Sequence, residues 1–305
     1  MTTLEATSQA GTMATILDGR AVAEQLRAEL RAECEALTVA LGASPVLAVV
    51  TVGDDPASRS YLNSIKRTCG RIGIECRPIA LAGTITEAAL CAAIVALNRD
   101  PTVNGVLVTL PLPTHLSAAA VAETLAPEKD IDGITPANAG RLALGMPAFA
   151  PNTPAGGMEM LHRYNIPIAG RHAVVVGRSG VVGKPMAYLL LQEDATVTIC
   201  HRRTPDLAAV VRRADIVVTG AGRAHLIDGS MLQPGAVVVD FGINFPDWSD
   251  GKMVGDVDFA SAVPVASAIT PVPGGTGPVT NMMLMRNTLV AARALVEGHS
   301  PLHVW

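Results

Sequence analysis

Three glycines that follow a short apolar run are the residues with the clearest chemical meaning in this sequence. The chain reads HAVVVGRSGVVGKPMAYLLL, with Gly177, Gly180 and Gly183 directly after the β-branched run. A strand, a glycine turn and a helix in this order let the backbone approach a phosphate, which then lies at the helix N-terminus. The stretch predicts a dinucleotide site, although Ser179 stands where the usual fingerprint has its second glycine. An ordinary strand–turn–helix crossover is the alternative.

Arginines flank both predicted strands of this stretch. Arg178 follows the first strand, and Arg202 and Arg203 follow the second, where the ribose of an adenosine would lie. Guanidinium groups there suit a 2′-phosphate, so the sequence favours NADP over NAD. The alternative, that these are solvated loop arginines, stays open.

Polar residues also gather where other predicted strands end, and open α/β sheets bind ligands at that edge. Tyr61 and Lys66 lie on a helix after the first strand, residues 109–113 end a later strand, Asp132 lies in the acidic turn KDIDG, and residues 271–278 form a proline- and glycine-rich loop. Taken singly, each has an ordinary reading as a helix-surface residue, a turn former or a connector. Only their combination indicates chemistry.

Composition excludes several classes of protein. Of 305 residues, 49% are hydrophobic and 16% are charged, which permits a large core and argues against disorder. A net charge of −4 gives no reason to expect a nucleic-acid partner, and no apolar run reaches membrane-spanning length. The five cysteines form no C-x-x-C pair, which argues for free thiols in a reducing cytosol and against a zinc site. We expect a cytoplasmic protein without a metal, whose Met1–Ala14 segment is a loose polar tail.

Strands and helices alternate along the chain, which predicts mostly parallel sheets. We expect helices over 16–41, 57–72, 86–98, 153–164, 185–192 and 279–297, and strands over 46–52, 74–80, 105–110, 172–176, 195–200, 216–219 and 236–241. Asp18 is a candidate N-cap of the first helix. A chain of 305 residues suggests two domains, and residues 127–145, rich in Gly, Pro, Asp and Asn, are the expected boundary.

Six separate segments together resemble one enzyme family. They are LVTLPLP (107–113), KDIDG (129–133), PNTPAG (151–156), VVGRSGVVGKPM (175–186), GDVDF (255–259) and PVPGGTGPVT (271–280). From about Ile16 to Val296 the chain resembles the bifunctional methylenetetrahydrofolate dehydrogenase/methenyltetrahydrofolate cyclohydrolase family. The resemblance implies an α/β protein of two lobes, with an N-terminal α/β catalytic domain, a Rossmann-like NAD(P)-binding domain and the active-site cleft between them. It also implies a homodimer. Residues 15–150 with 279–305 would form the catalytic, folate-binding domain, and residues 151–278 the NAD(P)-binding domain.

The family oxidises methylenetetrahydrofolate with NADP and hydrolyses the methenyl product to formyltetrahydrofolate, in one-carbon metabolism. The resemblance implies that Tyr61 stacks on or hydrogen-bonds the folate. It also implies that Asp132 accepts hydrogen bonds from the pterin ring, a task suited to an ionised carboxylate. The implied substrate-site residues are Tyr61, Asp132, Leu110, Pro111, Pro271, Pro273, Gly274 and Gly275. The implied cofactor-site residues are Gly177, Arg178, Ser179, Val182, Gly183, Arg202, Arg203, Gly220, Ala221, Gly242 and Thr276.

Two departures from the family fall in the active site. Ile65 stands four residues after Tyr61, where the family has the lysine most tied to hydrolysis, and Thr109 replaces the glutamine that supports that lysine. Losing one partner of a buried polar pair costs about 1–3 kcal/mol, whereas replacing both can be nearly neutral, so the two changes indicate a rebuilt pocket. Lys66 lies one residue further on, a rotation of about 100° around a helix. Asn152, in place of a frequent cysteine, is expected to matter little.

We expect the dehydrogenase to be retained, because hydride transfer mainly requires the folate carbon to be held close to the nicotinamide. Hydrolysis also needs proton transfers, for which Lys66, Tyr61 and Asp132 are the candidates beside the altered positions Ile65 and Thr109. Three alternatives remain: a dehydrogenase without cyclohydrolase, a non-catalytic folate or nucleotide binder, and a dehydrogenase for another small substrate. The intact cofactor loop argues against the binder, and Asp132 with the proline loop argues against another substrate.

Overall fold

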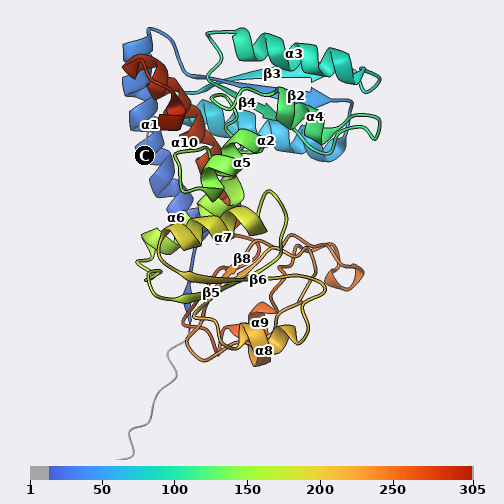
Figure 1. The fold of residues 1–305 in the computed structure, drawn as a ribbon, viewed down its shortest axis with the longest axis vertical. Coiled ribbons are helices and arrows are strands. Elements are labelled where there is room, and N and C mark those ends of the chain that lie inside the picture. Colours follow the sequence, from blue (N-terminus) through green and yellow to red (C-terminus); the bar gives the residue numbers. More distant parts are fainter. Residues whose placement is uncertain (1–13, 304–305) are drawn as a thin grey trace, which may run out of the picture.

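A computed structural model describes residues 14–303, so the predicted polar tail, except for Ala14, lies outside the described residues. Two lobes are stacked along the long axis, and each is built on a parallel β-sheet (Figure 1). The α/β class and the two-lobed architecture predicted from the sequence are confirmed.

The upper lobe in Figure 1 contains three strands in the order β3-β2-β4. β2 spans Val46–Val52, β3 spans Glu75–Leu81 and β4 spans Gly105–Val108, and β2 pairs in parallel with both neighbours. All seven residues of β2 are buried, as in a strand whose two faces are both covered by helices.

Helices cover the two faces of this sheet in alternation with the strand residues. Val46, Ala48 and Val50 share one core with α3 and α4, whereas Leu47 and Val49 share the other with α1 and α2. The bounds of these helices are Gly19–Leu41 for α1, Pro56–Ile72 for α2, Glu87–Arg99 for α3 and Ala118–Thr124 for α4.

The lower lobe contains six parallel strands in the order β1-β9-β8-β7-β5-β6. Their bounds are Thr15–Ile16, Ala268–Ile269, Val237–Asp240, Ile216–Thr219, His172–Val176 and Thr196–Cys200, in sheet order. Three helices belong to this lobe: α7 (Gly183–Gln192), α8 (Leu207–Val211) and α9 (Phe259–Ala262). The lower lobe also contains two short 3₁₀ turns, Gly229–Met231 and Asp247–Ser249. A third, Pro301–His303, lies at the end of the described chain.

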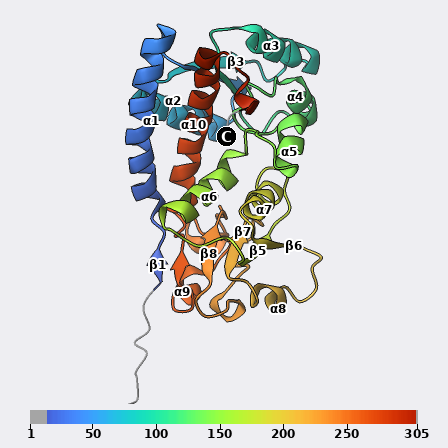
Figure 2. The ribbon, with the colours of Figure 1, turned by 60° about the vertical axis from the view of Figure 1, so that its left-hand side comes forward.

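Long helices join the lobes. α10 (Thr276–Glu297) packs along α1, and both run from the junction into the upper lobe (Figure 2). α6 (Asn152–Arg163) crosses beneath them, and α5 (Pro136–Ala143) packs on α7. The Glu159 carboxylate of α6 contacts Arg163 at 2.8 Å and Arg286 of α10 at 2.8 Å, which ties α6 to α10.

The structure corrects several predicted elements. Ile16 belongs to a strand, because Thr15–Ile16 pairs with β9, and α1 begins only after Asp18. Asp18 is the predicted N-cap and accepts hydrogen bonds from Arg20 N at 2.8 Å and Ala21 N at 3.2 Å. Residues 127–145 contain α5, and β9, α4 and α8 were not predicted. These missed elements are two to eight residues long, too short for a clear apolar period.

Candidate active site

A cleft of about 390 Å³ opens between the lobes, within the usual range of about 300–1,000 Å³ for small-molecule sites. Tyr61 lines it from the upper lobe, and Gly242 and the loop 271–278 line it from the lower lobe. Arg20, in the first turn of α1, and Thr280 and Asn281, in α10, also line the cleft. The predicted substrate residues Pro271, Pro273, Gly274 and Gly275 all lie on this cleft.

Glycines let the proline loop pack against the start of α1. A Cβ on Gly19 would lie 1.6 Å from the carbonyl oxygen of Gly275, and Gly19 N donates to Gly274 O at 3.0 Å. Gly274 has φ +109°, a conformation that side chains rarely adopt. Val272 and Pro273 are joined by a cis peptide bond. Gly19 and Gly274 therefore let the loop pack closely against α1, and the loop forms one wall of the cleft.

Tyr61 is carried by α2, whose start is fixed by a capping aspartate. Asp55 Oδ2 accepts a hydrogen bond from Ser58 N at 2.7 Å, and Pro56 occupies the first helical position. Loss of hydration and the negative charge of Asp132 raise the pKa of Tyr61 to about 12. Tyr61 therefore lies within electrostatic reach of Asp132, and the phenol stays protonated at neutral pH.

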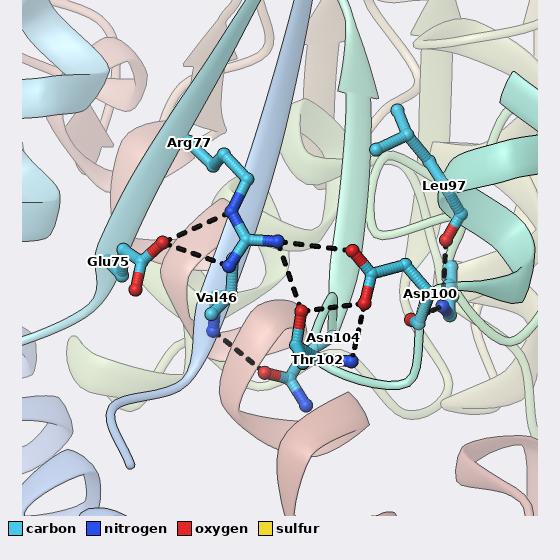
Figure 3. A network of polar contacts seen from close by, with 8 residues as sticks. Val46, Glu75, Arg77, Leu97, Asp100, Thr102 and Asn104 are labelled. Carbon is cyan, nitrogen blue, oxygen red and sulfur yellow. Dashed lines mark hydrogen bonds and ion pairs between the residues drawn. The ribbon is translucent and has the colours of Figure 1, made fainter. Parts of the chain in front are cut away.

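The turn KDIDG is anchored from its first residue. Lys129 Nζ donates to Leu97 O at 2.8 Å and to Asp100 O at 2.5 Å, where α3 ends. Asp100 belongs to the polar network at the amino end of the upper sheet, in which Arg77 Nη1 donates to Asp100 Oδ2 at 3.2 Å and to Thr102 Oγ1 at 3.0 Å (Figure 3). This network lies at the end of the sheet opposite the loop that follows β4, so Lys129 has a structural task.

The two carboxylates of KDIDG have different surroundings. Asp130 is fully buried and accepts hydrogen bonds from Ile134 N at 3.0 Å, Thr135 N at 2.8 Å and Asn138 Nδ2 at 2.8 Å. Asp132 accepts one, at Oδ1 from Asn152 Nδ2 at 2.7 Å. Within residues 14–303 no hydrogen bond reaches Asp132 Oδ2. Asp130 is therefore saturated by the fold, whereas Asp132 keeps acceptor capacity for a ligand.

Burial raises the pKa of Asp132 to about 6, although the hydrogen bond from Asn152 acts in the opposite direction. The charge of Asp130 adds a smaller upward contribution to that pKa. A carboxyl group with this pKa changes its ionisation near neutral pH, as groups at functional sites often do.

Ile65 and Thr109, the two positions at which the sequence is expected to depart from the family, lie in the interior. Ile65 is 1% exposed and belongs to the main hydrophobic core. Thr109 is 2% exposed, and its hydroxyl donates to Val50 O at 3.3 Å. Among the described residues no buried side-chain nitrogen or oxygen lacks a hydrogen-bond partner. The two substitutions therefore leave no unsatisfied polar group behind.

Several predicted site residues are not part of the cleft lining: Ile65, Lys66, Thr109, Leu110, Pro111 and Asp132. Lys66 is exposed on α2. Lys66 is not among the charges that act on Tyr61 or Asp132. On the loop after β4, Leu110 and Pro111 are exposed and joined by a cis peptide bond.

A second pocket, of about 540 Å³, lies over the carboxyl ends of β5, β6 and β7. Gly177 and Gly183 allow the backbone segments at the floor of this pocket to approach each other closely. A Cβ on Gly177 would lie 2.5 Å from Gly220 O, and a Cβ on Gly183 would lie 2.2 Å from Gly177 O. The Ser179 side chain satisfies two backbone N–H groups at the start of α7, because its Oγ accepts hydrogen bonds from Val182 N at 3.1 Å and from Gly183 N at 3.3 Å. This geometry explains how a serine replaces the second fingerprint glycine.

The lining of this pocket suits a phosphorylated dinucleotide. Of the predicted cofactor residues it contains Gly177, Arg178, Ser179, Arg202, Gly220 and Ala221. Val182 packs behind Gly220, and Arg203 is exposed, with its backbone N donating to His201 Nδ1 at 3.2 Å. The remaining predicted residues Gly242 and Thr276 lie on the cleft between the lobes. Three arginines, Arg178, Arg202 and Arg223, and glycines without a Cβ fit the charge and the close approach of a phosphate.

Several lining residues were not singled out from the sequence. Arg20, in the segment ILDGR (16–20), lines the cleft, and His201 and Arg223 line the nucleotide pocket.

Over the described range 14–303 no cluster of three His, Cys, Asp or Glu side chains could hold a metal ion. No helix in that range is long and apolar enough to cross a membrane. The fold and the two adjoining pockets define a two-lobed, nucleotide-binding α/β enzyme.

Two family models match the chain: the tetrahydrofolate dehydrogenase/cyclohydrolase catalytic domain over residues 17–132, and the NAD(P)-binding domain of the same family over residues 151–296. The bifunctional protein FolD of Chloroflexus aurantiacus is 56% identical over 280 residues, which are 92% of this chain and 98% of that protein. The corresponding protein of a Roseiflexus species is 58% identical over 280 residues, 92% of this chain and 96% of that protein. The chain belongs to the tetrahydrofolate dehydrogenase/cyclohydrolase family.

Solved structures agree with this assignment. The bifunctional FolD of Campylobacter jejuni superposes with a TM-score of 0.90 at 42% identity, over 92% of this chain and 99% of that chain. The methylenetetrahydrofolate dehydrogenase-cyclohydrolase of Trypanosoma brucei, complexed with NADP cofactor and inhibitor, has a TM-score of 0.88 at 37% identity, over 93% of this chain and 99% of that chain.

Proposed function

We propose that this protein oxidises methylenetetrahydrofolate to methenyltetrahydrofolate with NADP and hydrolyses the product to formyltetrahydrofolate, in one-carbon folate metabolism. The observation that carries the proposal is an acceptor, Asp132 Oδ2, that receives no hydrogen bond from the described residues. Asn152 holds this carboxylate next to Thr153, which lines the interlobe cleft together with Tyr61. The two relatives described above support both activities, because they are named bifunctional proteins and this chain aligns with 96–98% of their length.

For the oxidation step, the task of the chain is positioning. Asp132 accepts hydrogen bonds from the amino-pyrimidine edge of the pterin, and Tyr61 contacts the folate ring from α2. The wall at Pro271–Gly275 holds the substrate in the cleft, and the exposed residues Leu110 and Pro111 are assigned a contact with its outer part. The bound NADP supplies the hydride acceptor.

For hydrolysis, the proton transfers fall to groups other than a lysine at position 65. Ile65 and Thr109 donate no hydrogen bond to the substrate, because Ile65 is apolar and buried and the Thr109 hydroxyl bonds to Val50 O. Asp132, with a pKa of about 6, takes up or releases a proton near neutral pH. Tyr61, protonated at that pH, donates a hydrogen bond, and Lys66 is the third candidate.

For the cofactor, we assign the 2′-phosphate of NADP to Arg178 and Arg202, with Arg203 as an outer contact. The pyrophosphate lies on the turn formed by Gly177, Ser179 and Gly183 at the start of α7, backed by Val182. Gly220 and Ala221 contact the dinucleotide in the same pocket, and Gly242 and Thr276 contact its nicotinamide end in the cleft.

For organisation, we propose a catalytic domain of residues 15–150 with 279–305 and a nucleotide domain of residues 151–278, with β1 added to the sheet of the second. The protein acts as a homodimer in the cytoplasm and binds neither nucleic acid nor membrane. Sedimentation velocity at micromolar concentration is expected to give twice the chain mass of 31.5 kDa.

A spectroscopic assay with methylenetetrahydrofolate and NADP tests the proposal by following reduced cofactor and methenyl product together. If the protein catalyses both steps, reduced cofactor accumulates, and the absorbance of the methenyl product decays faster than in enzyme-free buffer. Accumulating methenyl product would mean a dehydrogenase without cyclohydrolase. No reduced cofactor with either NADP or NAD would contradict the proposal and favour a binding protein. Wild-type turnover after Tyr61→Phe and Asp132→Ala would contradict the site assignment.

A further inference from the structure

A chain of two side-chain amides links Asp132 to helix α10. Asn152, the first residue of α6, donates from Nδ2 to Asp132 Oδ1 at 2.7 Å and to Ile131 O at 3.2 Å. Its Oδ1 accepts from Asn287 Nδ2 at 3.1 Å. Asn287, on α10, also donates to Ile131 O at 2.9 Å and to Ala150 O at 3.4 Å. The three side chains come from three separate segments of the chain.

The orientation of both amides is determined by these contacts. The Asn152 NH₂ group faces a carboxylate and a carbonyl oxygen, so a flipped amide would put oxygen against oxygen twice. The Asn287 NH₂ group faces two carbonyl oxygens and the Asn152 oxygen, so it is fixed in the same way. Asn152 is 4% exposed, which shields its bonds from competing water.

We propose that Asn152 and Asn287 are positioning residues, which hold Asp132 by its Oδ1 and leave its Oδ2 for the substrate. The proposal rests on the assignment of Asp132 to the folate under the proposed function. Asn152 acts on the carboxyl group directly, and Asn287 acts through Asn152 by fixing which side of the amide faces Asp132. Neither residue is assigned a contact with the reacting atoms.

An asparagine is suited to this task because it donates twice and accepts once in one plane. Among the described residues, Asn152 is the residue that donates a hydrogen bond to the Asp132 carboxylate. The larger role given to Asn152 here differs from the minor effect expected from the sequence.

The test compares the variants Asn152→Leu and Asn287→Leu with the wild-type protein and with Asn98→Leu. Asn98 is the matched control, because its side chain also bridges two backbone groups, donating to Thr124 O at 2.8 Å and accepting from Ala126 N at 3.0 Å, but in the upper lobe away from Asp132. Two quantities are measured in each protein: the pH dependence of kcat/KM for methylenetetrahydrofolate, and the ¹³C NMR titration of the Asp132 carboxyl group.

Asn152→Leu is expected to raise the pH midpoint of both measurements by about one unit, since a hydrogen bond to a charged group is worth about a factor of ten or more. Asn287→Leu is expected to move both midpoints in the same direction by less, while Asn98→Leu leaves them unchanged. KM for the folate should rise in the two site variants more than kcat falls.

Unchanged midpoints in folded Asn152→Leu and Asn287→Leu would overturn the proposal. If Asn152→Leu does not fold, Asn287→Leu carries the test alone, because its site is only half-buried. If the wild-type protein shows no dehydrogenase activity, the proposed function fails. The NMR titration then still decides whether the two amides control Asp132.

Discussion

The two lobes surround their key carboxylates in opposite ways. In the lower lobe, the fully buried Asp256 accepts hydrogen bonds from Ala221 N at 2.6 Å, Gly222 N at 3.1 Å, Arg223 N at 2.9 Å and Asn244 Nδ2 at 2.9 Å. In the upper lobe, Asp132 accepts one hydrogen bond from the described residues. A carboxylate that accepts four hydrogen bonds holds the surrounding loops in place, and we call such a group a fastener. A carboxylate that accepts one hydrogen bond remains available to a ligand.

The comparison assigns different tasks to residues of the same type in similar motifs. Asp256 fixes the loop 221–223 that lines the nucleotide pocket, so its effect on the cofactor is indirect. Asp132 is left with a pKa of about 6, because burial outweighs its single donor. The fold therefore stabilises one carboxylate and leaves the other destabilised, as is common at functional sites.

The largest expected effect is on stability. Asp256→Ala removes a buried acceptor from three backbone N–H groups and one amide, at about 1–3 kcal/mol for each group left unsatisfied, of which water recovers a part. We expect a loss of about 4 kcal/mol in the free energy of unfolding, measured by urea denaturation. Asp258→Ala is the control in the same motif, since the Asp258 side chain makes no capping bond to α9. Equal losses in both variants would contradict the fastener role.

The second prediction concerns activity at the upper carboxylate. Asp132→Ala removes the acceptor of charge-assisted hydrogen bonds to the substrate, worth about 1.5–3 kcal/mol each. We expect kcat/KM for methylenetetrahydrofolate at pH 7.5 to fall by about 10²–10³-fold, while the Kd for NADP stays within about twofold. A fall in NADP affinity as large as the fall in kcat/KM would show that Asp132 affects cofactor binding as well as folate binding, and would contradict the separate tasks of the two lobes.

The third prediction reverses the sign of the stability effect. The pKa of Asp132 is raised from 3.8 to about 6 in the folded protein, so the native state binds more protons than the unfolded state between about pH 4 and pH 6. Stability contributed by this group falls as the pH rises through that window. Asp132→Asn is therefore expected to stabilise the protein at pH 8 by up to about 3 kcal/mol and to have little effect below pH 4.

Thermal unfolding of wild type and Asp132→Asn at several pH values measures this difference. A variant that is less stable than wild type at pH 8 would mean that Asp132 is a fastener like Asp256.

The smallest effect is the coupling between the two altered positions. Ile65→Lys places an ammonium group in the core, and Thr109→Gln adds a polar partner for it. We expect a coupling of about 1–3 kcal/mol in a double-mutant cycle of unfolding, with the double variant more stable than the sum of the single variants. Methenyl hydrolysis should rise only in the double variant. Additive effects would show that the two positions are independent.

Regular elements and sequence motifs were the parts that the sequence could predict. The strand His172–Val176 has the predicted bounds, because an apolar run is a local signal. Pro271–Gly275 line the interlobe cleft, and their contact with a substrate stays a prediction. The pairing of β1 with β9 was missed, since two-residue strands carry no period and depend on contacts over 250 residues apart.

Side-chain surroundings were beyond the sequence. KDIDG contains two aspartates two residues apart, and only the structure distinguishes the saturated Asp130 from the available Asp132. Asn152 and Asn287 lie far apart in the chain and meet only through packing of α6 on α10. The exposure of Lys66 likewise depends on how α2 packs against β3.

The most direct test of the available carboxylate is kcat/KM for methylenetetrahydrofolate from pH 5 to pH 8, in wild type and in Asp132→Asn. The account predicts that the wild-type value rises with pH around a midpoint of about 6, because the ionised carboxylate binds the pterin, and that the variant gives a low and flat profile. The same midpoint in Asp132→Asn, or a flat wild-type profile, would show that another group controls substrate capture.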